Sequence, residues 1–151
     1  MSGRLIDSVA HTGITCSDID ASIAFYRDVL GFPVSEKHRV GGAFFEQVTG
    51  VPGAEIDIAF VDGPGHRIEL LSYTAPEDRR PSTLRPCDPG FLHLSFYVDD
   101  IEVVVEAVRA HGYEPVNPIP ERPRSGVRGI YTRDPDGVVL EFMELPPPGA
   151  R

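Results

Sequence analysis

The chain repeats one arrangement of residues, in which a glutamate follows a turn glycine by four positions inside an apolar run. Glu69 follows Gly65 in this way, and Glu141 follows Gly137. The apolar residues around each glutamate predict a buried strand. An ionised carboxylate in such a strand is costly unless a positive group meets it. Both glutamates are therefore predicted to have a cationic partner.

The same order of landmarks extends over most of the chain. His11, in a predicted strand, is matched by His93. Eight positions after each histidine an isoleucine flanked by acids opens a helical pattern, which ends at Gly31 in the first copy and at Gly112 in the second. Chance rarely keeps so many landmarks in order, so the chain is predicted to contain two copies of one structural unit.

Each copy predicts the element order β-α-β-β-β. In the first copy the strand Leu5–Thr15 precedes a helix capped by Ser17 or Asp18, a strand Phe32–Arg39, and a hairpin of Glu55–Asp62 with His66–Tyr73. In the second copy the strand Phe91–Val98 precedes a helix Asp100–His111, a strand Tyr113–Asn117, and a hairpin of Val127–Arg133 with Val138–Leu145.

Neither copy can bury both its sheet face and its helix stripe alone. We therefore predict an α+β fold in which two βαβββ modules form one curved, mostly antiparallel eight-stranded sheet around a cleft, with helices outside. The predicted boundaries are a first module at 1–75, a linker at 76–90, a second module at 91–145 and a disordered tail at 146–151. Residues 40–54, with four glycines, predict a hairpin excursion or a mobile lid.

Composition excludes several kinds of partner. The 151 residues carry a net charge of −9, and no cluster of Lys and Arg offsets it, so binding to nucleic acid is not expected. No apolar run approaches a membrane span, and the N-terminus has no signal-peptide core, so we expect a cytoplasmic protein without a membrane partner. The cysteines, Cys16 and Cys87, form no metal-binding motif.

The two histidines and two glutamates form a candidate metal site. If a pseudo-twofold axis relates the copies, His11 with His93 and Glu69 with Glu141 converge near it. Two neutral imidazoles and two carboxylates cancel the charge of a divalent cation and leave coordination positions open. A single buried histidine is more often a core residue. Two of each type at corresponding positions favour metal ligands.

These residues and two motifs carry a family resemblance. Phe25–Phe32 reads Phe-Tyr-x-x-x-Leu-Gly-Phe, and Asp134–Glu141 reads Asp-Pro-Asp-Gly-x-x-x-Glu. With the two histidines, this order resembles the vicinal oxygen chelate superfamily of glyoxalases, bleomycin-binding proteins and extradiol dioxygenases. The resemblance implies paired βαβββ modules, a homodimer, a small-molecule substrate and a divalent metal (Ni, Fe, Co, Mn or Zn). It implies that the metal ligands are His11, Glu69, His93 and Glu141.

The resemblance is less specific about the reaction. Glyoxalase I holds glutathione with an arginine and an asparagine, and Thr15 and Tyr73 stand at those positions here. We expect a metal-dependent lyase or isomerase that abstracts a proton next to a metal-bound carbonyl, with Glu141 or Glu69 as the base. The alternatives are a metal-free protein that sequesters a drug or natural product, and a ring-cleaving dioxygenase. The residues expected to contact the substrate are Phe44, Phe45, Tyr97, Arg128 and Tyr131.

Overall fold

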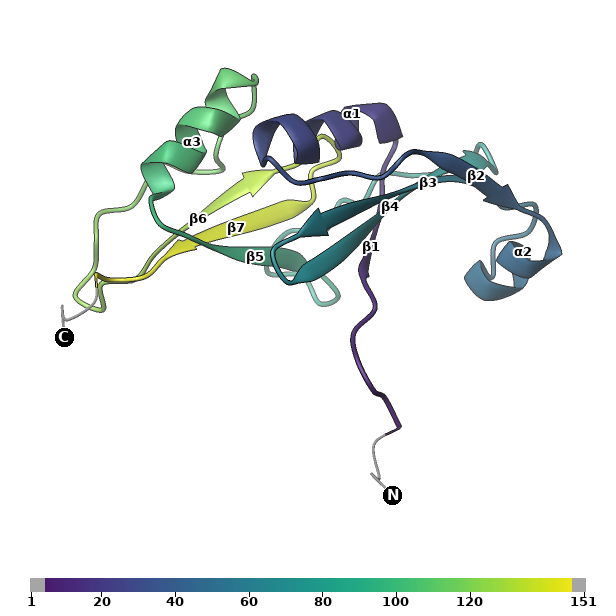
Figure 1. The fold of residues 1–151 in the computed structure, drawn as a ribbon, viewed down its shortest axis with the longest axis horizontal. Helices are drawn as coiled ribbons and strands as arrows, with labels where there is room; N and C mark the ends of the chain where they lie inside the picture. Colours follow the sequence, from purple (N-terminus) through teal and green to yellow (C-terminus); the bar gives the residue numbers. More distant parts are fainter. Residues whose placement is uncertain (1–4, 148–151) are drawn as a thin grey trace. The chain divides into compact units, whose positions relative to one another are not determined.

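The computed structural model describes residues 5–147, and Figure 1 shows the course of the chain. The chain divides into two compact units, Met1–Arg27 with Phe32–Glu77, and Asp28–Gly31 with Asp78–Arg151. No helix within residues 5–147 has an apolar segment of the length needed to cross a lipid bilayer. The predicted disordered tail lies mostly outside the described residues, since only residues 146 and 147 of it are described.

The first unit is built on a four-stranded sheet in the order β1-β4-β3-β2. β1 pairs in parallel with β4, while β3 pairs antiparallel with both β4 and β2. Helix α1 packs on β3 and β4 (Figure 1). The elements are β1 (Thr12–Thr15), α1 (Ile19–Ala24), the π-helical η1 (Phe25–Val29), β2 (His38–Gly41), α2 (Ala43–Thr49), β3 (Glu55–Gly63) and β4 (His66–Ala75).

The second unit is built on a three-stranded sheet in the order β5-β7-β6. β5 is parallel to β7, and β6 is antiparallel to it. Helix α3 packs on β6 and β7, and it buries Ile101, Val105 and Val108 (Figure 1). The elements are β5 (His93–Val98), α3 (Ile101–Ala110), β6 (Arg128–Arg133) and β7 (Val139–Glu144).

The helix starts and the long hairpin agree with the prediction. Asp18 caps α1, because its carboxylate accepts the amide hydrogens of Asp20 and Ala21. Asp100 caps α3 in the same way through the amide of Glu102. β3 and β4 form the predicted hairpin, paired from Gly63 with His66 next to the turn to Glu55 with Ala75 at the far end. The α+β class is confirmed, but within residues 5–147 the strands form one sheet of four and one of three, so a single sheet of eight is not found.

Three predicted strands are shorter or missing. The first predicted strand, Leu5–Thr15, is shortened to begin at Thr12. In the register of β1 with β4, Ala10 would lie opposite His66, where β4 begins, so the residues before Ala10 have no strand to pair with. In Phe32–Arg39 only Val34 forms a bridge, to Val61, before β2 begins at His38.

The predicted strand Tyr113–Asn117 is absent from the described structure. Val116 donates its amide hydrogen to the carbonyl of Tyr131, but Pro115 and Pro118 have no amide hydrogen to continue such a ladder.

The segment 40–54 is not a hairpin excursion, and a role as a mobile lid stays a prediction. It completes β2 and then forms α2, which ends at Gly50 in the left-handed conformation with φ of 69°. Phe45 of this helix packs against a buried cluster of Ala54, Ile56 and Ile58. The helix is therefore held against the sheet by apolar contacts of its own.

Candidate functional site

The first unit brings His11 and Glu69 together. His11 directly precedes β1, and the parallel register aligns Gly13 with Glu69 on β4. The His11 Nε2 atom lies 3.1 Å from the Glu69 Oε2 atom. The Glu69 side chain is 16% exposed, so the carboxylate is largely shielded but reachable from solvent.

The second unit builds the same pair from the same elements. His93 begins β5, and Ser95, two residues on, is aligned with Glu141 on β7. The His93 Nε2 atom lies 3.4 Å from the Glu141 Oε2 atom, and the Glu141 side chain is 21% exposed. In both units the residue two positions after the histidine is aligned with the glutamate. The sequence repeat therefore corresponds to two structurally equivalent His–Glu pairs.

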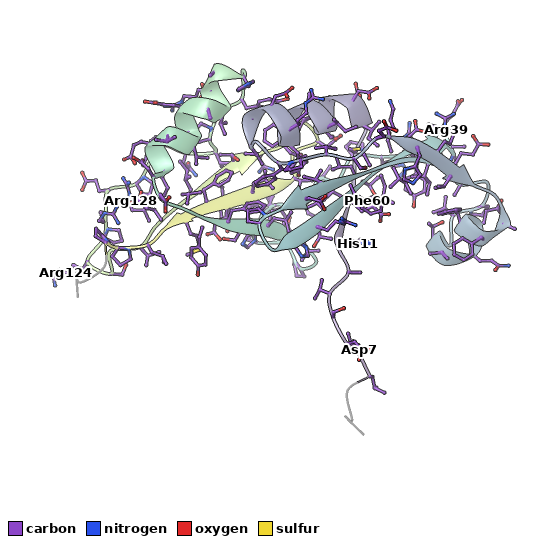
Figure 2. All side chains as sticks on the ribbon, viewed as in Figure 1. Asp7, His11, Arg39, Phe60, Arg124 and Arg128 are labelled. Atoms are coloured by element: carbon purple, nitrogen blue, oxygen red, sulfur yellow. The ribbon has the colours of Figure 1, made fainter. Side chains whose placement is uncertain are left out.

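An aromatic ring completes each pair. Phe60 on β3 is the cross-strand partner of Glu69, and Tyr131 on β6 is the partner of Glu141. The His11 and Phe60 ring centroids lie 6.3 Å apart with an edge-on orientation. Both residues are labelled in Figure 2. The His93 and Tyr131 centroids lie 5.4 Å apart. Phe60 is absent from the sequence prediction, because the two hairpins differ in spacing: nine positions separate Phe60 from Glu69, and ten separate Tyr131 from Glu141.

The atoms of each pair are close without forming a hydrogen bond. In the described part of the chain, the Arg39–Asp57 and Arg67–Asp62 ion pairs are also hydrogen bonds, whereas the two His–Glu contacts are not. Two ligand atoms bound to one metal at about 2.1 Å are separated by about 3.0 Å at right angles and about 3.4 Å at the tetrahedral angle. The observed separations of 3.1 and 3.4 Å suit two atoms that share a cation. The donor set therefore fits a divalent metal.

Arg128, predicted to contact the substrate, binds carboxylates of the second unit. Its guanidinium binds the carboxylates of Glu102 and Glu144, and Arg122 binds Glu144 as well. Glu144 is buried and also accepts the amide hydrogen of Ile101 at the start of α3. Arg128 is the cross-strand partner of Glu144, so the two side chains lie on the same face of the sheet. Glu144 is three residues from Glu141 on β7, so this face is the one opposite Glu141, on which α3 packs. Its role here is to tie α3 to β6 and β7.

This network also accounts for a group of three carboxylates, those of Asp100, Glu102 and Glu144, that lie close enough together to hold a cation. Two guanidinium groups, those of Arg122 and Arg128, already offset two of its three negative charges. The hydrogen bond from Arg128 lowers the pKa of Glu102 from its ordinary value of 4.5 to about 2. We assign this cluster to the stability of the second unit.

The remaining predicted contact residues have varied positions. Phe44, on α2, is 68% exposed and packs edge-on against Phe45. Tyr97, on β5, is 73% exposed. An open hollow of about 290 Å³ lies against α2, lined by Ala43, Glu46, Gln47, Gly50 and Pro52, and includes none of the predicted site residues. Substrate contacts for Phe44, Phe45 and Tyr97 stay predictions.

Comparison with known proteins identifies the family of the chain. The family model described as Glyoxalase/Bleomycin resistance protein/Dioxygenase superfamily matches residues 8–142. The chain is 32% identical over 141 residues to protein YwkD of Bacillus subtilis (strain 168), covering 93% of this chain and 98% of that protein. It is 31% identical over 157 residues to 2-epi-5-epi-valiolone epimerase of an Actinomyces species, covering 97% and 85%.

Among solved structures, a glyoxalase family protein from Bacillus cereus superposes with a TM-score of 0.82 at 26% identity, covering 95% of this chain and 97% of that one. The matched residues include both His–Glu pairs described above. The chain belongs to the Glyoxalase/Bleomycin resistance protein/Dioxygenase superfamily.

Proposed function

We propose that this protein is a metal-dependent lyase or isomerase that abstracts a proton next to a carbonyl of a small substrate. The observation that carries the proposal is the pair of equivalent His–Glu contacts, 3.1 and 3.4 Å long. Packing alone does not require a histidine and a glutamate at both copies of one structural position. A shared chemical role does.

The proposed ligands are His11, Glu69, His93 and Glu141, acting together on one divalent ion (Ni, Fe, Co, Mn or Zn). Their two carboxylates balance its charge, and four protein ligands leave positions for substrate oxygens. When bound, such an ion polarises a carbonyl and makes the adjacent C–H more acidic. A protein that only sequesters a small molecule has no need for four metal-binding side chains.

The proposed base is the carboxylate of Glu69 or Glu141. Each carboxylate is partly exposed on its strand, so a substrate C–H can approach it. Removing a proton from one face of a carbon and returning it to the other inverts that carbon. The relative named as an epimerase supports this kind of chemistry. Tyr131, beside His93, is the aromatic residue best placed to contact such a substrate.

The test is exchange of the substrate C–H with solvent deuterium, followed by NMR on small hydroxycarbonyl compounds. Wild-type protein loaded with metal is expected to exchange the proton, and Glu69→Gln or Glu141→Gln to lower the rate at least about 100-fold, as loss of a general base does. Glu106→Gln, on the exposed side of α3, is the matched control. Metal-loaded protein that binds these compounds without exchange contradicts the proposal.

The rival functions give other results in the same samples. A sequestering protein keeps its ligand affinity in Glu141→Gln, and a ring-cleaving dioxygenase consumes oxygen with a catechol. We also propose a homodimer, as the family resemblance implies. Light scattering of the purified protein is expected to give twice the chain mass of 16.5 kDa, and a monomeric mass contradicts this.

A further inference from the structure

Arg67 lies beside the His11–Glu69 pair and has no part in the proposed proton transfer. It precedes Glu69 by two residues on β4, so both side chains are on the same face of the sheet. Its guanidinium carbon lies 5.4 Å from the centroid of the Phe60 ring, and Phe60 is the cross-strand partner of Glu69. The cation therefore stands next to the candidate site.

Phe60 fixes where this cation lies. A guanidinium over an aromatic face is attracted to the ring. Its N–H groups point outward in the plane of the guanidinium, so they stay free to bind other groups. The same ring contacts His11, and the His38 ring lies 6.5 Å away. One phenyl ring thus holds a proposed metal ligand and a permanent cation side by side.

The hydrogen bonds of Arg67 leave most of its donors unused. Within residues 5–147 its side chain makes one hydrogen bond, from Nε to Asp62 at 2.8 Å. By contrast, Arg39 uses Nε and Nη2 together on Asp57. The Arg67 side chain is 52% exposed, so its two Nη groups are open to a ligand. Guanidinium groups bind carboxylate and phosphate oxygens through such paired donors.

We propose that Arg67, oriented by Phe60, binds an anionic group of the substrate, a carboxylate or a phosphate, attached near the reacting carbonyl. This inference rests on the proposed function for the position of the carbonyl. Residues two apart in a strand are about 6.6 Å apart, which is the span of a few bonds in a small substrate. Because the whole chain carries a charge of −9, an anionic substrate needs a local cation at the site.

The test compares three hydroxycarbonyl probes in the deuterium-exchange assay: neutral dihydroxyacetone, hydroxypyruvate with a carboxylate, and dihydroxyacetone phosphate. At least one anionic probe is expected to exchange faster than the neutral one at low concentration. Arg67→Met is expected to raise the KM for that probe about 10- to 100-fold, with little effect on kcat. Arg67→Lys is expected to recover part of the loss. A faster exchange of hydroxypyruvate would identify the anionic group of the substrate as a carboxylate, and a faster exchange of dihydroxyacetone phosphate would identify it as a phosphate.

A calorimetric titration of metal-free protein with each anionic probe measures binding without the reaction. Wild type is expected to bind one of them and Arg67→Met to bind it at least about tenfold more weakly. Arg39→Met, whose partner Asp57 lies on the same sheet, is the matched control. Asp62→Asn frees the Nε donor and is expected to tighten binding, which a folding defect would not imitate.

The two proposals fail separately. Anion binding that depends on Arg67, without exchange of any probe, overturns the proposed function and leaves the anion site. Exchange that is equally fast for all three probes, and unchanged in Arg67→Met, overturns the anion site alone. If no probe binds or exchanges, both are wrong.

Discussion

Glu69 on β4 lies directly opposite Phe60 on β3, and the Phe60 ring also packs edge-on against His11. In the second unit Glu141 likewise lies opposite Tyr131, whose ring is tilted at 39° to the His93 ring. A His–Glu pair and an aromatic ring are thus the repeated component of the molecule. We expect the ring to limit how far the imidazole can turn away from its glutamate.

Removing the ring at Phe60 should loosen His11. We predict that Phe60→Ala weakens metal binding about 2- to 10-fold, which corresponds to the 0.5–1.5 kcal/mol of one aromatic contact. Phe60→Tyr keeps the ring and should bind metal as the wild type does. A chelator competition titration measures the affinities. Equal affinity in Phe60→Ala and wild type would show that the ring does not orient the ligand.

The Glu144 network should dominate the stability of the second unit. Glu144→Gln leaves the guanidinium groups of Arg122 and Arg128 without their buried carboxylate. We predict a loss of about 3 kcal/mol in the free energy of unfolding, the cost of breaking a partly buried ion pair. Urea denaturation measures it, with Glu106→Gln within about 0.5 kcal/mol of wild type as the control. A loss below about 1 kcal/mol would contradict this role.

Glu102 should contribute to the free energy of unfolding in a way that depends on pH. Its pKa in the folded protein is about 2, below the ordinary 4.5, because Arg128 donates hydrogen bonds to it. A carboxyl whose pKa is lowered by folding stabilises the protein above its unfolded pKa, and this contribution is lost as the pH falls from about 4.5 towards 2.

NMR titration of the Glu102 carboxyl carbon measures this pKa. In Arg128→Met it should return towards 4.5, and Glu102→Gln should show a shallower loss of stability over the same pH range. A Glu102 pKa that is unchanged in Arg128→Met would assign the shift to another cause.

The helix cap at Asp18 should have a local effect. Asp18→Ala removes the acceptor of two amide hydrogens at the start of α1, those of Asp20 and Ala21. We predict a loss of about 1 kcal/mol in the free energy of unfolding, while Asp18→Ser should retain most of it. Thermal or urea unfolding distinguishes the two variants. An unchanged stability in Asp18→Ala would mean that solvent replaces the cap.

Local signals in the sequence predicted much of this fold. The Asp18 cap, the start of α3 next to Asp100 and the hairpin of β3 with β4 follow from polar residues and turn glycines that act on their neighbours. The family follows from the matched histidines and glutamates. The pairing of each histidine with the glutamate of its own copy is visible only through strand register.

Features that depend on distant contacts were missed. Helix α2 has seven residues, too few for a helical period to be recognised, and its Phe45 is held by Ile56 and Ile58. The place of Phe60 opposite Glu69, and with it the contact of Arg67 with the Phe60 ring, depends on the register of β3 against β4. The charge of Arg128 is apparent in the sequence, whereas its ion pair with the buried Glu144 is not.

The most direct test of the central claim is the metal content per chain, measured by elemental analysis of untagged protein purified without chelator. If both pairs bind one ion, as proposed, we predict about one divalent ion per chain, lost entirely in His11→Ala and also in His93→Ala. His111→Ala, at the end of α3, should retain it. Two ions of which each variant loses one, or no metal even after reconstitution, would contradict the shared metal site.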